Sequence, residues 1–451
     1  MRSIFMGAAL ALAVVGMAQA ADDPHVRALA AGYKAAFLCS GVFNAGQTEA
    51  QVAADDLEGI YPDYQALVRT LPATVDRQAK TVSVPFDEKL PPRIAAWRPG
   101  LGCAQLPIGA PSAGVAKLPQ LAIKPPVAKA QWPDGDEGAT APGPAKLAPV
   151  LAAAFDRAAY GGATTAVLVV RDGRIVGEQY RAGYDLHTPQ RTWSAAKSLT
   201  ATVIGRAVQL GKTKVDAPAN IPEWRTPGDP RAAITLAQLM HMGSGLWTDG
   251  PGNRTDEVYL GGGLVTEWAT HMPLDVAPDT RFRYANNDTL LAARSVRASL
   301  GDGRAALEFP FAELLWKIGM RHTTPERQGN YILSSQVWTT ARDLARLGLL
   351  YQNDGVWNGE RLLPEGWSKF VATPAPVQPS GDGPGYGGFF WLYGPKQGLP
   401  DGTYVMNGNR GQFVFIVPSK KVIIVRRGFD AAGGPRFEEA KFARDVLAAL
   451  D

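Results

Sequence analysis

The chain has 451 residues, of which 46% are apolar and 20% are charged, and its formal net charge is +4. A chain of this length and composition is expected to fold into two or three globular domains. Its Lys and Arg residues are scattered and form no basic run. The sequence therefore gives no sign of a nucleic-acid-binding protein or of a polybasic membrane anchor.

The first twenty residues have the pattern of a secretory signal peptide. Arg2 is followed by the apolar run 4–15 and by the small residues Ala18-Gln19-Ala20, so we expect cleavage before Ala21. The apolar run is too short to span a bilayer, and no other run approaches the length of about 18 residues that a span needs. We therefore expect a soluble protein of the periplasm or the extracellular space, with no stable membrane span after cleavage.

Residues 21–115 are expected to form an N-terminal extension. Helical patterns cover Val26–Leu38 and Glu49–Leu57, and Lys80–Phe86 has the pattern of a short strand. The stretch 116–147 is rich in Pro, Ala and Gly, which predicts a linker or an irregular strap over the surface.

The chain has two cysteines, Cys39 and Cys103. In an oxidising compartment we expect them to pair and close a loop of about 60 residues; two buried thiols are the alternative. No Cys-x-x-Cys or His-x-x-x-His spacing occurs, so the sequence gives no support for a metal site. The Gly383–Gly388 stretch fits G-x-G-x-x-G, but no strand precedes it and no helix follows. It is therefore expected to be a loop, and no dinucleotide cofactor is expected.

A second unit, 148–451, has strand patterns at both ends and helical patterns between them. Two strands joined by Asp172-Gly173 are expected to form a hairpin. The expected elements are helices at Leu151–Ala159, Ser194–Leu210, Ala341–Tyr351 and Glu438–Leu450, and strands at Thr164–Val170, Arg174–Tyr180, Tyr404–Met406, Phe413–Val417 and Val422–Arg427. We expect an α+β fold in which early and late strands form one antiparallel sheet flanked by helices, beside a helical lobe.

The motif Ser194-Ala195-Ala196-Lys197 lies where a helix is expected to begin. Residues three apart share a helix face, so the Ser194 hydroxyl and the Lys197 amine can touch. A serine needs a base to become a nucleophile, and burial lowers the pKa of a lysine far enough for it to act as one. Chance occurrence of this pattern is the alternative.

Tyr284-Ala285-Asn286 is the candidate for a third group. A tyrosinate beside a lysine ammonium is a feasible base, and the Asn286 amide can hold both the lysine and a substrate. The same pattern recurs at Tyr351-Gln352-Asn353, where it ends an amphipathic helix, so Tyr351 is interpreted as structural.

The glycine-rich Asn407–Gln412 segment leads into a strand. Gly411 allows close approach of the backbone to a ligand, and the N–H groups of Gln412 and Ser194 are candidates for an oxyanion hole. A glycine-rich hairpin turn is the alternative interpretation.

From about residue 150 onward the chain resembles the serine hydrolases related to class C β-lactamases and penicillin-binding DD-peptidases. The stretch Thr339–Gly348 is similar to the branch that contains 6-aminohexanoate-dimer hydrolase. The resemblance rests on Ser194–Ser198, Tyr284–Asn286, Ile234–Leu246, Thr339–Gly348, Trp357–Gly359 and Leu363–Trp367. It implies a β-lactamase/transpeptidase-like fold and an acyl-enzyme on Ser194, with proton transfer by Lys197 and Tyr284 and a small ester, amide or peptide as substrate.

One triplet departs from the family pattern. Where the family usually has a lysine-led triplet, or His-x-Gly in its esterase-like branch, this chain has Asn409-Arg410-Gly411. Arg410 either replaces the missing cation and clamps a substrate carboxylate, or points away and pairs with an acid on the scaffold. The change weakens a β-lactamase assignment more than it weakens the assignment of a generic hydrolase. A β-lactamase or D-amino-acid peptidase is the nearest alternative to an esterase or amidase. A catalytically silent relative that binds peptidoglycan or a protein is the other alternative.

Overall fold

The structure is a computed structural model that describes residues 23–126, 130–248, 255–301 and 303–451. The signal peptide predicted for residues 1–20 lies outside these ranges. The chain divides into two compact units, which are treated separately below. Unit 1 comprises Met1–Gln120 with Asp256–Gly263, and unit 2 comprises Leu121–Thr255 with Leu264–Asp451.

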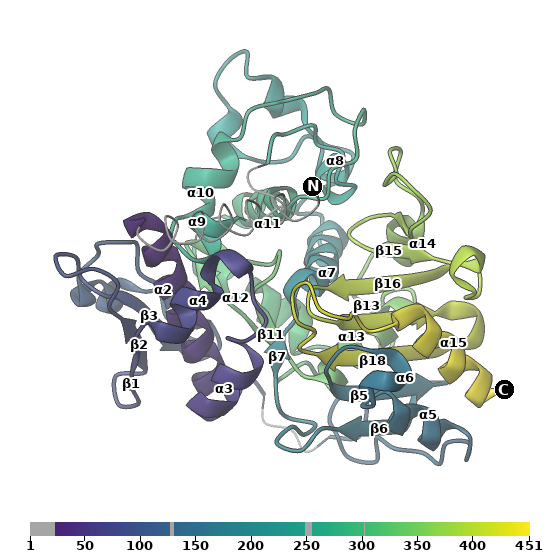
Figure 1. The fold of residues 1–451 in the computed structure, drawn as a ribbon. Helices are drawn as coiled ribbons and strands as arrows, with labels where there is room; N and C mark the ends of the chain where they lie inside the picture. Colours follow the sequence, from purple (N-terminus) through teal and green to yellow (C-terminus); the bar gives the residue numbers. More distant parts are fainter. Residues whose placement is uncertain (1–22, 127–129, 249–254, 302) are drawn as a thin grey trace, which may run out of the picture. The chain divides into compact units, whose positions relative to one another are not determined.

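Unit 1 packs helices against a four-stranded antiparallel sheet of order β1-β2-β3-β4 (Figure 1). The sequence patterns predicted two of its helices and one of its strands, and missed the rest. The elements are α2 (Pro24–Phe43), α3 (Glu49–Asp55), α4 (Pro62–Thr70), β1 (Thr74–Asp76), β2 (Thr81–Val84), β3 (Arg93–Arg98), β4 (Gly102–Gln105), η1 (Ser112–Lys117) and α9 (Asp256–Tyr259).

Helix α2 is the core of unit 1. Asp23 caps it by accepting from the N–H groups of His25 and Val26, and Pro24 occupies the first turn, where no N–H is needed. Among the described residues, α2 is the one helix long and apolar enough to cross a membrane by length and composition. The expectation that no run after residue 15 approaches the length of a membrane span is therefore wrong for Pro24–Phe43, by length and composition. Of its most apolar window 72% is buried inside the protein, as in the core helix of a folded domain.

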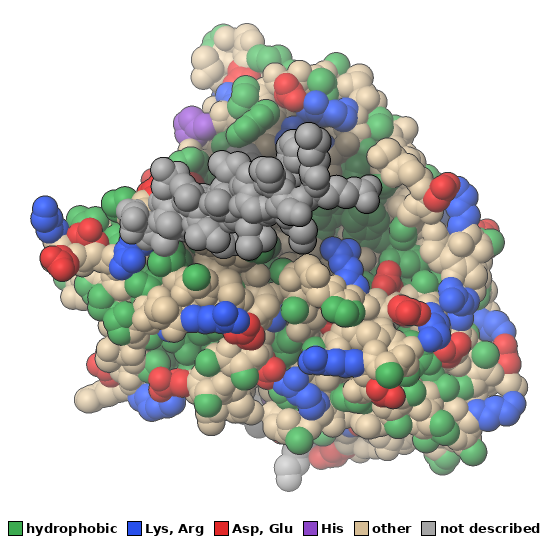
Figure 2. Space-filling model, viewed as in Figure 1, with side chains coloured by type: hydrophobic (Ala, Val, Ile, Leu, Met, Phe, Trp, Pro, Cys, Tyr) green, Lys and Arg blue, Asp and Glu red, His purple; other side chains and the backbone are tan. Residues whose placement is uncertain are grey.

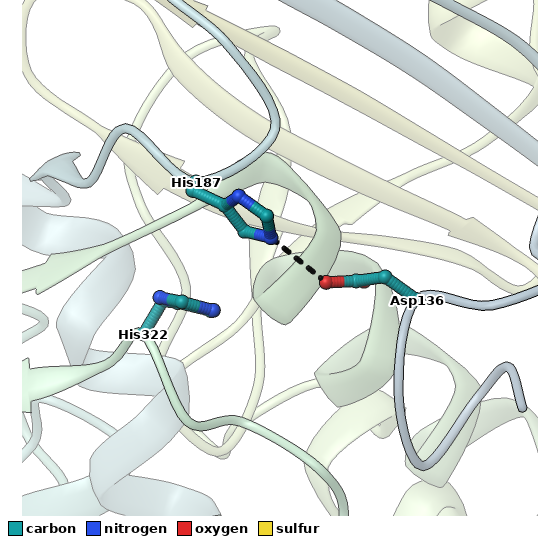
Figure 3. A group of neighbouring side chains, drawn as sticks. All are labelled: Asp136, His187 and His322. Carbon is teal, nitrogen blue, oxygen red and sulfur yellow. Dashed lines mark hydrogen bonds and ion pairs between the residues drawn. The ribbon is translucent and has the colours of Figure 1, made fainter. Parts of the chain in front are cut away.

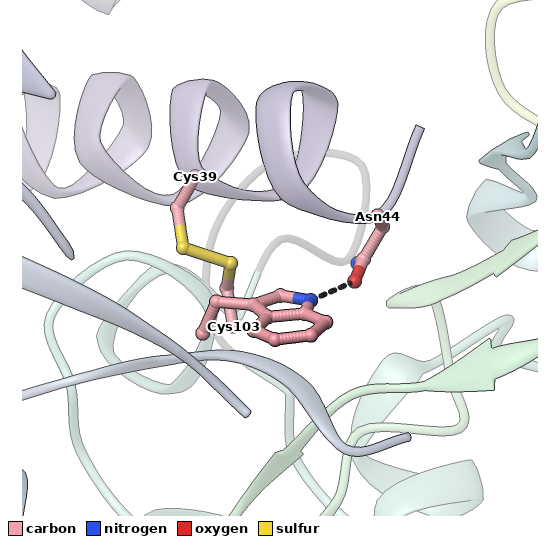
Figure 4. The surroundings of a disulfide bond; sticks show 4 residues. Cys39, Asn44 and Cys103 are labelled. Atoms are coloured by element: carbon pink, nitrogen blue, oxygen red, sulfur yellow. Dashed lines mark hydrogen bonds between the residues drawn. A yellow bond between two sulfur atoms is a disulfide. The ribbon is translucent and has the colours of Figure 1, made fainter. Parts of the chain in front are cut away.

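A disulfide joins Cys39 on α2 to Cys103 on β4, as the sequence predicted (Figure 4). Beside it, Trp97 Nε1 donates to Asn44 Oδ1 at 2.8 Å, so the indole is fixed against the end of α2. The bond closes a loop between residues 64 apart, which stabilises unit 1 by restricting its unfolded chain.

Unit 2 is built on a seven-stranded antiparallel sheet of order β14-β15-β16-β17-β18-β5-β6. Strands from the start and the end of the unit meet where β5 pairs with β18, as predicted. Asp172 and Gly173, both with positive φ, form the β5–β6 turn. The strands are β5 (Thr164–Arg171), β6 (Arg174–Tyr180), β14 (Gly385–Tyr386), β15 (Trp391–Tyr393), β16 (Thr403–Gly408), β17 (Gln412–Val417) and β18 (Val422–Gly428). The Gly383–Gly388 stretch, expected to be a loop, contributes the edge strand β14.

Helices cover both faces of this sheet (Figure 1). The terminal helices α5 (Leu147–Ala153), α6 (Arg157–Tyr160) and α15 (Glu439–Leu450) share one hydrophobic core with the strands, in which Phe442 and Val446 lie with Val167 and Phe415. Helix α13 (Ala341–Gln352) packs on β17 and β18; Gly348 lies so close to Ile423 that no side chain fits between them.

The remainder of unit 2 is mostly helical, as expected. Short strands also occur there. Strand β11, which follows the Ser194 helix in the chain, pairs with β7 before that helix and with β8 after it, and the three form one sheet. The elements are β7 (Gln190–Arg191), η2 (Trp193–Ala195), α7 (Ala196–Gln209), η3 (Pro222–Trp224), η4 (Pro230–Ala233), α8 (Leu236–Met240), α10 (Val265–Trp268), η6 (Ala269–His271), α11 (Asn286–Leu300), α12 (Arg304–Pro310), η7 (Phe311–Leu315), β8 (Thr324–Pro325), β9 (Arg327–Gln328), β10 (Asn330–Tyr331), β11 (Val337–Thr339), β12 (Val356–Trp357), β13 (Glu360–Arg361), α14 (Trp367–Ala372), η8 (Pro395–Gln397) and η9 (Pro418–Lys420).

The proline-rich stretch is anchored to unit 2 by polar contacts. Arg346 donates to the carbonyl oxygens of Pro133 and Gly135, each at 2.7 Å. Trp357 Nε1 donates to Asp134 Oδ1 at 2.8 Å, and the Trp132 indole donates to Gly173 O at 2.7 Å. The part from residue 130 onward is thus a strap on the surface of unit 2.

Lys and Arg side chains alternate with Asp and Glu side chains on the face drawn in Figure 2. Among the visible side chains of the described residues, no charge of one sign dominates a broad area, in keeping with the modest net charge of +4.

Candidate active site

Ser194 lies in the tight turn that precedes α7. The turn residues Trp193–Ala195 form a 3-10 helix, and α7 begins at Ala196. Trp193 has a φ of 50°, a left-handed conformation that costs energy for a bulky residue. The Arg191 guanidinium lies 4.0 Å from the centre of the Trp193 ring and helps to hold this conformation. Ser194, the next residue, is half-buried.

Lys197 lies one helical turn after the serine and is almost fully buried, with 1% of its surface exposed. Its Nζ is 3.1 Å from Ser194 Oγ. The same nitrogen donates to Asn286 Oδ1 at 2.7 Å and to the Ser334 carbonyl oxygen at 2.9 Å. None of these three partners is a carboxylate, so the contacts orient the amine without forming an ion pair.

Burial lowers the pKa of Lys197 to about 7. The nearby Asp288 acts in the opposite direction through its negative charge. Burial also raises the pKa of Asp288 to about 7, although the hydrogen bond from Ser244 Oγ at 2.9 Å favours its charged form. Near neutral pH a substantial fraction of Lys197 is therefore an uncharged amine, the form that accepts a proton.

The segment that presents the Ser334 carbonyl is fixed from two sides. Thr200 Oγ1, on α7, donates to Leu333 O at 2.9 Å. Arg191 donates to Ser335 O at 3.2 Å and to Ser335 Oγ at 2.9 Å. The lysine pocket is therefore built from α7, α11 and the stretch before β11.

Tyr284 lies beside Lys197, whose Nζ is 4.8 Å from the centre of the tyrosine ring. The ring is also held by Trp391 and Tyr386, with centroid separations of 5.5 and 5.9 Å. Tyr386 is buried, and the edge strands β14 and β15 supply both of these aromatic neighbours. The second Tyr-x-Asn pattern lies elsewhere: Tyr351 is buried and its hydroxyl is 3.0 Å from Thr202 Oγ1.

The edge formed by β16 and β17 packs directly against the Ser194 turn. A side chain at Gly408 would clash with the Thr192 carbonyl oxygen, 2.1 Å from the ideal Cβ position. That position is also 3.0 Å from the Ala195 nitrogen. Gly408 is the ladder partner of Gln412, so the backbone of Gln412 begins its strand beside the serine turn.

The Gln412 side chain is used to fix this edge. Its Nε2 donates to Arg410 O at 3.1 Å and to Gly428 O at 2.6 Å, and its Oε1 accepts from Arg427 Nε at 2.7 Å. Arg427 also donates to the carbonyl oxygens of Thr339 and Gln190. This network ties β17 and β18 to the strands around the serine turn.

Arg410 is folded back onto the end of β18. Its side chain is buried, its Nε donates to Asp430 O at 3.3 Å, and its guanidinium carbon is 5.4 Å from the centre of the Phe429 ring. Asn409 is exposed, and its Oδ1 accepts from the Arg410 N–H at 2.9 Å. These contacts of Arg410 are with the scaffold. Gly411, at the turn, has a φ of 80°.

Sequence reasoning missed Asp288, Ser334 and the strained backbone of Trp193. Asp288 carried a usable signal, because an acidic residue in the first turn of a helix two positions after Asn286 is a candidate for burial beside Lys197. Ser334 contributes a backbone carbonyl, which no residue pattern reports.

A family model for beta-lactamase matches residues 151–427, which is more than half of the chain. The chain belongs to the beta-lactamase family. It is accordingly a serine hydrolase of this superfamily. The family match lies within the part of the chain that contains the seven-stranded sheet and the Ser194 turn.

Individual relatives are distant. The chain is 24% identical over 304 residues to a 6-aminohexanoate-dimer hydrolase from Paenarthrobacter ureafaciens, covering 58% of this chain and 72% of that protein. The fold is similar to a family VIII carboxylesterase, with a TM-score of 0.54 and 15% identity over 70% of this chain and 98% of the other. It is also similar to a penicillin-binding protein homologue from Caulobacter crescentus, with a TM-score of 0.53 and 16% identity over 69% and 99% of the two chains.

Proposed function

We propose that this protein hydrolyses an ester or amide bond through an acyl-enzyme formed on Ser194. The observation that carries the proposal is the distance of 3.1 Å between Ser194 Oγ and the buried Lys197 Nζ, a lysine whose pKa is lowered to about 7 by burial. A lysine near this pKa accepts a proton at neutral pH, and the serine then becomes an effective nucleophile.

In the first half-reaction Ser194 Oγ attacks the carbonyl carbon and its proton moves to Lys197 Nζ. The Tyr284 hydroxyl relays a proton to the leaving oxygen or nitrogen, and the carbonyl re-forms as that bond breaks. In the second half-reaction a water molecule attacks the acyl carbon, its proton passes to the Lys197 and Tyr284 pair, and Ser194 Oγ is released with a proton.

The N–H groups of Ser194 and Gln412 bind the oxyanion in both half-reactions. The close packing of Gly408 on the serine turn supports this assignment, because it brings the first residues of β17 to the same place. Asn286 holds the Lys197 amine from the opposite side through the 2.7 Å contact.

The position of Arg410 favours an uncharged or amide substrate over one recognised by its carboxylate. Its guanidinium is buried against Phe429 and Asp430, while β-lactams and D-alanyl peptides both carry a carboxylate next to the scissile bond. A short amide oligomer or a simple ester does not require a carboxylate clamp. We also propose export to an oxidising compartment, since the Cys39–Cys103 disulfide is typical of exported proteins.

A substrate panel tests the proposal. The purified protein and its Lys197→Met variant are assayed with p-nitrophenyl esters, nitrocefin, D-alanyl peptides and linear 6-aminohexanoate oligomers. We expect turnover of an ester or amide oligomer, with kcat/KM at least about 100-fold lower in the variant. Preferential turnover of nitrocefin or D-alanyl peptides would instead favour a β-lactamase or peptidase. Absence of any turnover would favour a silent binding protein.

A further inference from the structure

Asp136, His187 and His322 converge at a second place in unit 2, apart from the residues of the Ser194 site. One donor atom from each side chain lies within 4.8 Å of the other two (Figure 3). We propose that these three residues bind a divalent transition-metal ion, for which Zn²⁺ is the best-matched candidate. Two imidazoles and one carboxylate are a ligand set that Zn²⁺ commonly takes in proteins.

The three ligands come from separate segments of unit 2. Asp136 lies on the strap that follows residue 130, His187 lies in the loop before β7, and His322 lies in the loop before β8. The tertiary fold brings them together, since 51 residues separate even the first two. The three residues are therefore too far apart in the sequence to form a recognisable metal-binding motif.

One pair of donor atoms has the separation expected at a tetrahedral ion. His187 Nε2 lies 3.2 Å from Asp136 Oδ2. Two ligands at about 2.0–2.1 Å from a tetrahedral Zn²⁺ are about 3.3 Å apart. The two histidine rings have centroids 4.7 Å apart, both histidines are exposed, and a donor atom of His322 lies within 4.8 Å of the other two donors.

Neighbouring side chains orient the carboxylate for this role. Asp136 Oδ1 accepts from Arg346 at 2.7 Å and forms an ion pair with Arg342 at 3.3 Å, and this leaves Oδ2 directed at His187. Supporting contacts of this kind fix the direction of metal ligands and tune their affinity.

Each of the two arginines that contact Asp136 has a second carboxylate partner. Arg342 also pairs with Glu178, and Arg346 pairs with the buried Asp343 at 2.8 Å. Arg321 also lines the surface hollow in which the group lies, so the support for an ion here comes from the two imidazoles and the Asp136 carboxylate, and not from an excess of negative charge.

The three side chains lie in one surface hollow, which Glu137, Arg321, Arg342 and Arg346 also line. An ion held by three protein ligands keeps at least one position for water, and the hollow leaves room for it. Such an ion would fasten the strap to two loops of the hydrolase unit. This proposal is independent of the chemistry proposed at Ser194.

Metal titration tests the site. The protein is prepared without a polyhistidine tag, treated with a chelator, and titrated with Zn²⁺ by calorimetry and with Co²⁺ by visible absorption. We expect one ion per chain, and an affinity weaker by more than about 100-fold in His187→Gln and in His322→Gln. The matched control is His271→Gln, another exposed histidine, which we expect to bind as the wild type does.

Histidine variants are preferred to Asp136→Asn, because loss of that carboxylate also breaks the Arg346 contact and endangers folding. Thermal melts of the metal-free variants verify that each is folded. Zn²⁺ binding that is equally strong in His187→Gln, His322→Gln and the wild type would overturn the proposal, as would a wild type that binds no Zn²⁺ at millimolar concentration.

Discussion

The buried carboxyl group of Asp288 raises the pKa of Lys197, in opposition to the burial that lowers this pKa to about 7. The carboxyl group is itself held by Ser244, whose hydroxyl donates to it at 2.9 Å. Because Lys197 Nζ also lies 3.1 Å from Ser194, a change at Asp288 is expected to alter proton transfer at the serine.

We expect Asp288→Asn to move the acid limb of the pH profile of kcat/KM to lower pH. Lys197 acts as a base in its neutral form, so activity rises as pH passes its pKa. Removing the carboxylate removes the effect that raises this pKa, and the neutral amine then persists at lower pH. The exposed Asp401→Asn variant is the control, and an acid limb that does not move in Asp288→Asn would contradict the coupling.

The same variant is expected to change how stability depends on pH. The folded-state pKa of Asp288 is raised to about 7 from an ordinary value of 3.8. The stability contributed by this group is fully present below its ordinary pKa, and is lost as pH rises through about 7. Urea unfolding at pH 4 and pH 7 should therefore show a smaller loss in Asp288→Asn than in the wild type; an identical loss would speak against a protonated Asp288.

Loss of the tyrosine hydroxyl is expected to reduce kcat in Tyr284→Phe and to reduce stability in Tyr351→Phe. Tyr284→Phe keeps the ring against Trp391 and Tyr386, so we expect it to fold normally and to lose about 100-fold or more in kcat. Tyr351→Phe loses the contact with Thr202 in the core and should cost about 1 kcal/mol of stability with little change in kcat. Steady-state kinetics and thermal melts of both variants would expose the reverse pattern if the roles are exchanged.

Arg410→Gln is expected to reduce stability and leave substrate charge preference unchanged. The guanidinium is packed on Phe429 and donates to Asp430 O, contacts whose loss should cost about 1–2 kcal/mol. The measurement is KM for matched substrates with and without a carboxylate. If KM rises for the carboxylated substrate alone, Arg410 binds substrate and our placement of it on the scaffold is wrong.

The local parts of this structure could be predicted from sequence, and the long-range parts could not. The Ser194 and Lys197 contact follows from their spacing on one helix, and the β5–β6 hairpin follows from Asp172-Gly173. Apolar runs also predicted the central strands. The direction of Arg410, by contrast, depends on Phe429 and Asp430 across a turn, and spacing does not encode it.

The buried polar groups and the Asp136, His187 and His322 cluster could not be predicted from the sequence either, because they too depend on contacts between distant segments. The Ser334 carbonyl acquires its role only because Thr200 and Arg191 fix its segment against α7. In unit 1 the patterns missed the strands β1, β3 and β4, which are short, and pairing with neighbouring strands decides their structure more than their own propensities do.

Labelling with a fluorophosphonate tests the central claim most directly. The reagent forms a stable bond with an activated serine, and intact mass spectrometry counts the adducts per chain. We expect one adduct on the wild type, located by peptide mapping to Ser194, none on Ser194→Ala, and much slower labelling of Lys197→Met. Equal labelling of the wild type and Ser194→Ala would contradict the assignment of Ser194 as the nucleophile.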